Sequence, residues 1–527
     1  MKAYIESGKA VVGIEFGSTR IKAVLIGEDF APIAQGAYDW ENRLENGVWT
    51  YHMEDVWTGL QTAYANLKAD VKKLYGANLT SFAALGVSAM MHGYLAFDKN
   101  DQLLVPFRTW RNTMTGPAAE ELTKLFGFNI PQRWSIAHLH QAILNKEAHV
   151  PSIAFITTLA GLVHWKLTGR KVLGVGDASG MFPIDSTTGT YHAGMLDQYD
   201  AHIASCGFPW KIRDILPAVL SAGEDAGTLT AEGALLLDPT GETKPGALLA
   251  PPEGDAGTGM AATNSVAPRT GNVSAGTSVF AMVVLEKSLS KVYPEIDMVT
   301  TPTGMPVAMV HCNNCTSDIN AWADMYAGFA KAAGLSIDKG RIYETLFTSA
   351  MQGDKDCGGI VNVNYLSGEP VTGLNEGRPM LVRMPDAHLQ FPNLARALVY
   401  GAIVTLKIGM DLLADEKVQI DSLLGHGGFF KTPGTAQKLL AGALNTPVSV
   451  METAGEGGPW GMALLAAFRA QKKENECLED FLSGRVFANT VATSLSPDAA
   501  DTEGFAAYEA LFRKALSAEE AAVSEMD

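Results

Sequence analysis

The stretch VVGIEFGSTRIKAVLI, residues 11–26, decides the fold of this chain. Apolar residues alternate along both of its halves, and Gly17-Ser18-Thr19 separates them, which is the pattern of two short strands joined by a tight turn. A second stretch, GNVSAGTSVFAMVVL at residues 271–285, repeats this pattern around a glycine and two hydroxyl residues, 259 positions later. Because the interval is too long for a solenoid repeat, it predicts the duplication of a whole lobe.

The rest of the chain follows an α/β pattern, in which strands alternate with helices. Helices are predicted at residues 54–75, 116–126, 317–334, 393–413 and 435–444. We expect a first lobe over residues 1–264, a second over 265–490, and a helical extension over 491–527. Four large apolar residues of the extension recur at the spacing of one helix face: Phe505, Tyr508, Leu511 and Phe512.

Composition and charge exclude several classes of protein. A chain of 527 residues is too long for one compact core, and about two to four domains are expected. The net charge of -17 argues against a nucleic-acid partner, because counterion release needs clustered Lys and Arg. Five cysteines are too few for a disulfide scaffold, and no long apolar segment precedes the first strand. A cytoplasmic protein without a membrane partner is predicted.

The two hairpin turns are candidate phosphate sites. Glycine lets a ligand approach the backbone closely, and the N–H and O–H groups of such a turn bind phosphate oxygens. One Gly-Ser-Thr turn is usually structural, but its recurrence favours a ligand. Glu15 before the first turn and Lys22 after it are suited to Mg²⁺ and a phosphate, whereas Ser274 stands at the position equivalent to Glu15. The alternative for Lys22 is an exposed strand residue without a ligand.

A single aspartate is the candidate catalytic base. Asp255 lies in the glycine-rich segment PPEGDAGTG, residues 251–259. A positioned carboxylate there could accept the proton of a sugar hydroxyl during phosphoryl transfer. The alternative is an aspartate that caps the turn after it.

Three residues are candidates for a sugar pocket. Met91 and His92 follow an apolar run and could supply an apolar wall and a hydroxyl partner, although a lone histidine there is usually a satisfied core residue. Trp110 could stack on a sugar face, although a lone tryptophan more often belongs to the core.

Other motifs carry weaker signals. The glycine turn at residues 425–428 offers a bare backbone surface for adenine or ribose, and the segment GEGGPWG at 455–461 indicates close helix packing. Cys312 and Cys315 form a CxxC without a second pair, which favours a helix-entry turn with buried thiols over zinc or redox chemistry. The sequence contains neither a GxxxxGK[ST] loop nor the protein-kinase motifs, so any ATP is held in another way.

Together these residues resemble the FGGY carbohydrate kinases over residues 11–468, and the Met91-His92-Gly93 segment resembles the xylulokinase branch. The resemblance implies two ribonuclease-H-like lobes of the actin and hexokinase type, with an active-site cleft between them, and ATP and Mg²⁺ as cofactors. It implies Asp255 as the base and Met91, His92, Trp110 and Asp255 as substrate-binding residues. Glu15 and Asp255 would hold the metal. The implied ATP-binding residues are Gly17, Ser18, Thr19, Lys22, Gly276, Thr277, Ser278, Gly427, Gly428 and Thr432.

Three positions depart from the family pattern. Glu15 stands where the family commonly has the shorter Asp, Arg111-Asn112 replaces Asn-Asp after Trp110, and Ala256 follows the base where an amide residue often contacts the sugar. The expected activity is the ATP-dependent phosphorylation of a terminal hydroxyl of a xylulose-like ketopentose, or of a related ketose or polyol. An actin- or Hsp70-like ATPase and a sugar-sensing pseudokinase are the alternatives, and a homodimer is left open.

Overall fold

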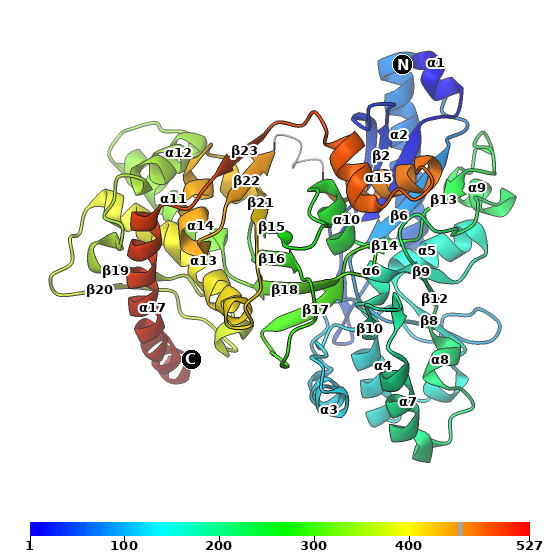
Figure 1. Ribbon diagram of the computed structural model, residues 1–527, viewed down its shortest axis with the longest axis horizontal. Helices are drawn as coiled ribbons and strands as arrows, with labels where there is room; N and C mark the ends of the chain where they lie inside the picture. Colours follow the sequence, from blue (N-terminus) through cyan, green and yellow to red (C-terminus); the bar gives the residue numbers. More distant parts are fainter. Residues whose placement is uncertain (452–456, 527) are drawn as a thin grey trace. The chain divides into compact units, whose positions relative to one another are not determined.

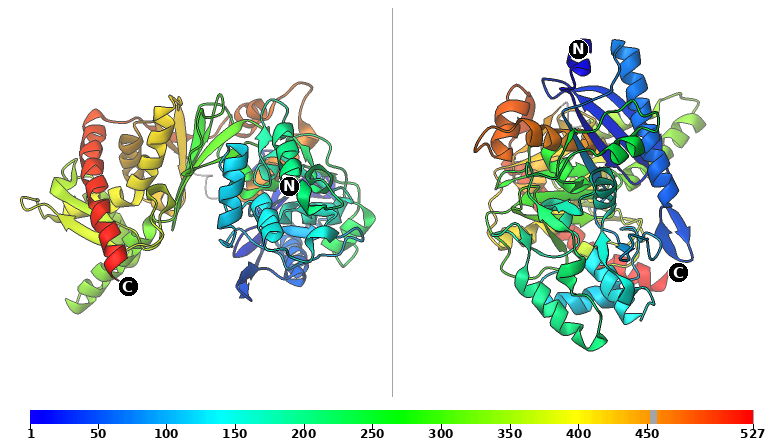
Figure 2. Two further views of the ribbon diagram at one scale, coloured as in Figure 1. Left: turned by 90° about the horizontal axis from the view of Figure 1, so that it is seen from below. Right: turned by 90° about the vertical axis from the view of Figure 1, so that its right-hand side faces the viewer.

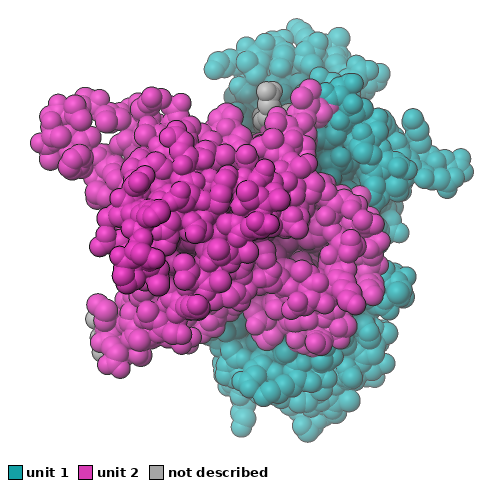
Figure 3. Space-filling view, turned by 60° about the vertical axis from the view of Figure 1, so that its left-hand side comes forward, with its two compact units in different colours: residues 1–266, 297–307, 456–489 teal, residues 267–296, 308–455, 490–527 magenta. Residues whose placement is uncertain are grey.

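The computed structural model describes residues 1–451 and 457–526. The chain divides into two compact units, shown in teal and magenta in Figure 3. Unit 1 comprises residues 1–266, 297–307 and 456–489, and unit 2 comprises residues 267–296, 308–455 and 490–527. The division near residue 266 lies beside the expected one at 264. The units differ from the continuous lobes that we expected, because residues 297–307 and 456–489 return to unit 1 and the extension packs as part of unit 2.

Unit 1 is built on a six-stranded sheet (Figure 1) with the order β13-β6-β1-β2-β3, and β14 also pairs with β6. Strands β1, β2 and β3 pair antiparallel, whereas β6 runs parallel to β1, and β13 and β14 run parallel to β6. The β1–β2 pair is the first predicted hairpin, which is confirmed. The strands are β1 (Val11–Phe16), β2 (Arg20–Ile26), β3 (Pro32–Asp39), β6 (Ala84–Ala89), β13 (Leu248–Leu249) and β14 (Glu253–Gly254).

Helix α2 (Met53–Tyr75) covers one face of this sheet and confirms the helix predicted at residues 54–75. Its backbone approaches β3 at Gly36, where an added β-carbon would lie 2.2 Å from the carbonyl oxygen of Ala63. Gly36 pairs with Ala23, and Ala23 pairs with Ile14, so this row of residues faces α2. The helix ends at Gly76 in the left-handed conformation that glycine favours.

Helix α15 (Gly457–Gln471) covers the opposite face. A β-carbon at Gly13 would lie 2.1 Å from the carbonyl oxygen of Pro459, and one at Gly86 would lie 2.8 Å from that of Met462. Gly13 and Gly86 are paired in the sheet, so the helix crosses both strands at their glycines. This packing explains why α15 belongs to unit 1, although it follows strands of the second sheet in the sequence. Gly455 and Glu456 of the GEGGPWG segment lie outside the described residues.

The other main elements of unit 1 surround this sheet. They are α1 (Lys2–Glu6), β4 (Arg43–Glu45), β5 (Val48–Thr50), β7 (Leu95–Phe97), α3 (Gly116–Phe126), α4 (Ser135–Leu144), β8 (Phe155–Thr157), α5 (Leu159–Thr168), β9 (Val172–Gly174), α6 (Val175–Ala178), β10 (Ile184–Asp185), β11 (Thr190–Tyr191), α7 (Ala193–His202), α8 (Ile212–Ile215), β12 (Ala218–Leu220), α9 (Ala231–Leu237), α10 (Asp255–Ala262) and α16 (Leu478–Phe481). Helix α3 has the predicted bounds.

The second sheet has the order β17-β18-β16-β15-β21-β22-β23. Its β15–β16 pair is the second predicted hairpin, and β21 runs parallel to β15 as β6 does to β1. The shared pattern supports the predicted duplication. The strands are β15 (Thr270–Ala275), β16 (Val279–Val284), β17 (Ile296–Thr300), β18 (Pro306–Cys312), β21 (Ser422–His426), β22 (Val448–Met451) and β23 (Ala492–Leu495).

The helices of unit 2 are α11 (Thr316–Ala332), α12 (Lys339–Ala350), α13 (Phe391–Asp415), α14 (Thr435–Leu444) and α17 (Ala499–Glu525), and β19 (Ile360–Val363) pairs with β20 (Met380–Arg383). Helices α11, α13 and α14 confirm the predicted ones within a few residues, α17 confirms the helical extension, and α12 was not predicted. Helix α13 is long and apolar enough to cross a membrane, but 78% of its most apolar window is buried, as in a core helix.

The terminal helix α17 is fixed to unit 2 by a buried ion pair. It packs against α14 and β19 (Figure 2), with Phe505, Tyr508 and Phe512 buried. Asp501 on α17 lies 3.3 Å from Arg396 on α13, and both side chains are almost fully buried. Arg396 also donates to the carbonyl oxygen of Ala350. Such a pair defines how the helix docks, because either charge alone would be costly to bury.

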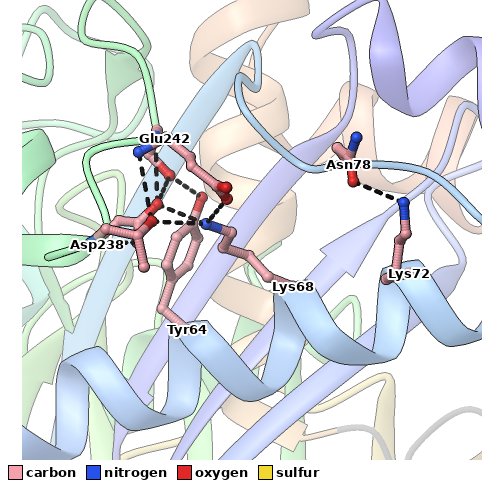
Figure 4. Close-up of polar contacts among 8 residues, drawn as sticks. Tyr64, Lys68, Lys72, Asn78, Asp238 and Glu242 are labelled. Carbon is pink, nitrogen blue, oxygen red and sulfur yellow. Dashed lines mark hydrogen bonds and ion pairs between the residues drawn. The ribbon is translucent and has the colours of Figure 1, made fainter.

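A second buried ion pair ties α2 to the segment after α9 (Figure 4). Lys68 Nζ donates to Asp238 Oδ2 at 2.7 Å and to Glu242 Oε2 at 2.8 Å. Asp238 also accepts from Thr240 and Thr243. Burial alone would raise the pKa of the Asp238 carboxyl, but the bonds from Lys68, Thr240 and Thr243 outweigh it and lower the pKa to about 2.

Replacing Lys68 by alanine is expected to lower the free energy of unfolding by about 2 to 3 kcal/mol, because it leaves the Asp238 carboxylate buried without its cation. Urea denaturation measures the change. Lys72→Ala is the matched control, since Lys72 lies one turn further along α2, is exposed, and bonds only Asn78 at 3.0 Å. Equal losses in both variants would contradict a stabilising role for the Lys68 pair.

Candidate active site

Four polar side chains form one row across the unit 1 sheet. In the strand register, Lys22 pairs with Glu15, Glu15 with Ser88, and Ser88 with Glu253. Paired residues of neighbouring strands point to the same face, so Glu15 and Lys22 lie side by side as the sequence predicted. The row also brings in Glu253, which the sequence analysis did not single out.

Asp255 follows this row at the first position of α10. Its Oδ1 accepts hydrogen bonds from the backbone N–H groups of Met91 at 3.2 Å and Ala256 at 3.0 Å. The bond from Ala256 is the local contact that the capping alternative expects, and the bond from Met91 joins the carboxylate to the predicted sugar wall. Although the residue is exposed to solvent, the protein atoms around its carboxylate still desolvate it and raise its pKa.

Glu15 lies beside Asp255 and at the first turn of α15. A β-carbon at Gly458 would lie 2.2 Å from Oε1 of Glu15, so this glycine leaves room for the carboxylate. Burial, and next the Asp255 carboxylate, raise the pKa of Glu15 to about 7, although Lys22 lowers it. Desolvation also raises the pKa of Asp255, against the N–H bonds from Met91 and Ala256. A carboxylate whose charge is disfavoured by a neighbouring carboxylate suits a divalent cation between the two.

Behind Asp255 lie two further carboxyl groups, Asp177 on α6 and Glu253 on β14. Glu253 accepts from the backbone N–H groups of Gly176 at 3.2 Å and Asp177 at 2.9 Å. Asp177 Oδ2 accepts from Thr158 at 2.6 Å, and its buried Oδ1 has no hydrogen-bond partner among the described residues. Burial raises the pKa of Asp177 to about 7 and that of Glu253 to about 8. Each of these two residues stands in an apolar run that contains glycine, and this pattern is the sequence signal by which they could have been predicted.

The Met91-His92-Gly93 segment forms the wall beside Asp255. His92 is buried, with φ 70°, and its Nδ1 faces the carbonyl oxygen of Gly180 at 3.2 Å. Its ring stacks on Trp134, with centroids 6.4 Å apart. A positive φ is uncommon for histidine and indicates that this conformation is held by its surroundings. Burial lowers the pKa of His92 well below its ordinary value, so the imidazole is neutral.

Trp110 lies in a turn that is bridged to this wall. Tyr94, next after Gly93, exchanges two backbone hydrogen bonds with Arg108. Trp110 itself is 39% exposed, so it is available for stacking rather than part of the core. The departure at Asn112 has a structural role here, because its side chain bonds both backbone groups of Trp49 at 2.8 Å.

Arg133 is a cation that the sequence analysis missed. It lowers the pKa of both His92 and Asp255, which places its charge near the wall and the candidate base. Its guanidinium forms an ion pair with Asp297, and its carbonyl oxygen accepts from the N–H group of Gly93. No motif distinguished this arginine, and its partner lies 164 positions away in the sequence.

The turn of the first hairpin is held from behind by aromatic residues. Trp40 Nε1 donates to the carbonyl oxygen of Gly17 at 2.7 Å, and Tyr51 donates to that of Ser18 at 2.6 Å. The backbone N–H of Trp40 donates to the carbonyl oxygen of Thr19. All three carbonyl oxygens of the turn are therefore occupied, as a turn that presents donors to an anion requires.

The second hairpin is held by the CxxC turn. The N–H groups of Cys315 and Thr316 donate to the carbonyl oxygens of Thr277 and Gly276, each at 3.0 Å. Cys312 and Cys315 are free, buried thiols, and burial raises the pKa of both. The predicted helix-entry turn is confirmed, since α11 begins at Thr316.

The register of the second hairpin differs from that of the first. Ser274 faces Phe280, whereas the equivalent Glu15 faces Lys22. The connection after Ser278 is one residue shorter, and neither Phe280 nor Ala281, the residue equivalent to Lys22, is a cation. The two turns match as predicted, and the strands after them are offset.

The predicted adenosine turn lies next to the second hairpin. Gly427 has φ 101°, and a β-carbon there would lie 2.4 Å from the carbonyl oxygen of Ala275, so only glycine fits. A β-carbon at Gly428 would meet nothing within 4 Å, which leaves an open backbone surface. The carbonyl oxygen of Thr432 accepts from Thr435 at the start of α14. Unit 1 thus brings together Glu15, Lys22, Met91, His92 and Asp255, and unit 2 brings its two glycine turns together.

The buried carboxyl groups predict a pH-dependent stability. The folded pKa of Asp177 is raised to about 7, so its contribution to stability is complete below the unfolded pKa of about 4 and is lost as the pH rises through 7. Between about pH 4 and 7, Asp177 makes the free energy of unfolding of the parent chain fall by up to about 1.4 kcal/mol per pH unit. Asp177→Asn removes this titration, so the variant is expected to show a slope that is shallower by that amount. Urea denaturation at several pH values measures both slopes, and parallel slopes would exclude a protonated Asp177.

Known proteins match the chain over most of its length. The FGGY family of carbohydrate kinases matches at residues 10–238 with its N-terminal domain and at residues 271–470 with its C-terminal domain. The xylulose kinase of Klebsiella pneumoniae is 24% identical over 443 residues, covering 79% of this chain and 81% of that relative.

Solved structures share the fold. A xyloylose kinase from Brucella ovis has a TM-score of 0.77 at 20% identity and covers 97% of this chain and 100% of its own. A gluconate kinase from Lactobacillus acidophilus has a TM-score of 0.78 at 17% identity, with 97% and 98% covered. These likenesses confirm the predicted α/β fold with two lobes. With both domains matched in the predicted order, the chain belongs to the FGGY family of carbohydrate kinases, enzymes that phosphorylate sugars with ATP and Mg²⁺.

Proposed function

We propose that this kinase phosphorylates a terminal hydroxyl of a neutral ketose or polyol, of which xylulose is the leading candidate, with Asp255 as general base. The observation that carries the proposal is the bond from the N–H of Met91 to Asp255 Oδ1, which sets the carboxylate at the edge of the Met91-His92 wall. The name of the Klebsiella pneumoniae relative, a xylulose kinase, supports the same sugar class.

Asp255 takes the proton of the sugar hydroxyl as that oxygen bonds to the γ-phosphorus and the bond to ADP breaks. Its Oδ1 is held by two backbone N–H groups, which leaves Oδ2 to face the hydroxyl. Phosphoryl transfer depends mainly on alignment and charge stabilisation, so a carboxylate fixed in this way is sufficient.

The chain's own groups fit Mg²⁺ and ATP. Glu15 and Asp255 are neighbouring carboxylates, and the Asp255 carboxylate raises the pKa of Glu15, an effect that a bound cation would offset. When bound, Mg²⁺ neutralises charge on the phosphates. Lys22 and the Gly17-Ser18-Thr19 turn would bind phosphate in unit 1. In unit 2 the phosphate ligands would be Gly276, Thr277 and Ser278, and Gly427, Gly428 and Thr432 would border the adenosine.

The charges near Asp255 favour a neutral sugar over a sugar acid. Arg133 is the cation near the wall, and its guanidinium is already paired with Asp297. The other titratable groups around the wall are the carboxyl groups of Glu15, Asp177, Glu253 and Asp255, and burial favours the neutral forms of Asp177 and Glu253 by raising their pKa. A sugar carboxylate there would meet the charge of Asp255, and the cation of the same row, Lys22, lies opposite Glu15 and is assigned to phosphate. Trp110, which is partly exposed, would stack on the sugar face.

The alternatives are an actin- or Hsp70-like ATPase and a pseudokinase that binds sugar without phosphorylating it. Both would release ADP at a rate that sugar does not raise. The departures at Glu15 and Ala256 are the features that favour a weakened kinase. A cytoplasmic location, the absence of a membrane partner and a homodimer are further parts of the proposal that await tests.

Coupled ADP release over a panel of ketoses, polyols and sugar acids tests the proposal. Neutral ketoses are expected to stimulate release and gluconate is not. Asp255→Ala is expected to lower kcat by at least about a thousandfold, because the proton acceptor and the alignment are both lost. Asp324→Ala, at an exposed carboxylate of unit 2, is the control. Stimulation by no sugar, or full activity in Asp255→Ala, would overturn the kinase mechanism.

Substitutions at Glu15 test the metal assignment. Glu15→Asp keeps the charge and shortens the side chain, so activity is expected to persist with a half-saturating Mg²⁺ concentration shifted by about three- to tenfold. Glu15→Gln removes the charge and is expected to lose most of kcat. Titrations of activity against Mg²⁺ measure both effects. Unchanged Mg²⁺ dependence in the two variants would exclude Glu15 as a metal ligand.

A further inference from the structure

Three helices of unit 1, away from the kinase residues, bring two histidines and a glutamate together. Glu121 lies on α3, His140 on α4 and His202 at the last position of α7. Helix α3 contacts both α4 and α7 (Figure 1). One ligand atom from each of the three side chains lies within 4.8 Å of the others.

The carboxylate of Glu121 is shared between the two imidazoles. Its Oε1 lies 2.7 Å from Nε2 of His202, and its Oε2 lies 3.5 Å from Nε2 of His140. The histidine rings are 5.5 Å apart. With metal bonds of about 2.0 to 2.1 Å and tetrahedral angles, ligand atoms lie about 3.3 Å apart. The three ligand atoms lie within 4.8 Å of one another, so closing around one ion requires side-chain shifts of up to about 1.5 Å.

His140 supplies a second, independent observation. Its side chain is 2% exposed, and its Nε2 makes no hydrogen bond with any described residue although it faces Glu121. A buried polar atom without a partner is costly, and a ligand removes that cost. On the other side of the ring, Nδ1 faces the hydroxyl of the buried Tyr199 at 3.5 Å. Metal-bound histidines usually have such a partner at the second nitrogen.

A simple surface ion pair does not account for this arrangement. His52 and Glu45 form such a pair in the same unit, with Nε2 2.8 Å from Oε1 and both side chains more than two-fifths exposed. That pair has no third ligand among the described residues. At Glu121, a second imidazole is buried against the free oxygen of the carboxylate.

We propose that Glu121, His140 and His202 bind a divalent transition-metal ion, zinc being the best match. Two imidazoles and one carboxylate, with water in the fourth position, are a ligand set that zinc takes, whereas Mg²⁺ and Ca²⁺ prefer oxygen ligands. The ion would fasten α3, α4 and α7 to one another. Helix α4 begins at Ser135, which donates to the carbonyl oxygen of Gly93, so the metal would also stiffen the helix behind the His92 wall.

The test is calorimetric titration of Zn²⁺ into the chelator-treated full chain. It is done in a C206S/C477S background, because those two cysteines are exposed and thiolates are themselves zinc ligands. One equivalent is expected to bind and to raise the Tm. His202→Ala and Glu121→Ala are expected to weaken this binding at least tenfold, in line with the loss of a ligand. Co²⁺ in place of zinc is expected to give the visible absorption of a four-coordinate site.

His52→Ala is the matched control and is expected to leave zinc affinity unchanged. His202 and Glu121 are chosen over His140 because their side chains are 31% and 40% exposed, so their loss does not open the core. No bound equivalent in the parent chain, equal affinity in His202→Ala and the parent, or a Co²⁺ spectrum of a hexa-aqua ion would each overturn the assignment. Sugar kinase activity is not the readout, so failure here leaves the proposed function untouched.

Discussion

The close approach of α15 to the unit 1 sheet is the constraint on which the site depends. Glycine at position 13 lets the helix backbone reach β1, where a β-carbon would lie 2.1 Å from the carbonyl oxygen of Pro459. The same helix leaves room for Glu15 at Gly458, and at Gly461 it packs against α10, with a β-carbon position 2.0 Å from the carbonyl oxygen of Thr258. One packing contact therefore places both Glu15 and the helix that begins with Asp255.

The four carboxyl groups near this contact differ in burial. Glu253 and Asp177 are buried, and Glu253 uses both oxygens to hold the start of α6. Because burial favours the neutral forms of both groups, they lie behind Asp255 without the repulsion that two full negative charges would cause. Glu15 and Asp255 lie nearer to solvent, although desolvation raises the pKa of both. What distinguishes the two pairs is exposure, because only Glu15 and Asp255 are open to a cation from solvent.

The sequence predicted what depends on local pattern and missed what depends on long-range packing. Alternation and glycine position predicted both hairpins, and helical spacing predicted α2, α3 and α14 almost to the residue. The return of residues 456–489 to unit 1 was not predictable, because it follows from glycines 13 and 86, far away in the chain. Arg133 was missed for the same reason, since its partner Asp297 is remote. Asp177 could have been noticed as an acid inside an apolar run.

The two hairpins show how a duplicated element acquires different chemistry from a small change. Both present glycine and hydroxyl groups, and both are braced through their carbonyl oxygens, the first by Trp40 and Tyr51 and the second by the CxxC turn. The second connection is one residue shorter, which sets Ser274 opposite Phe280. A carboxylate and a cation can face each other across the first pair of strands only. The difference follows from the residue types as well as the offset, because Ala281 stands at the position equivalent to Lys22 and Ser274 at that of Glu15.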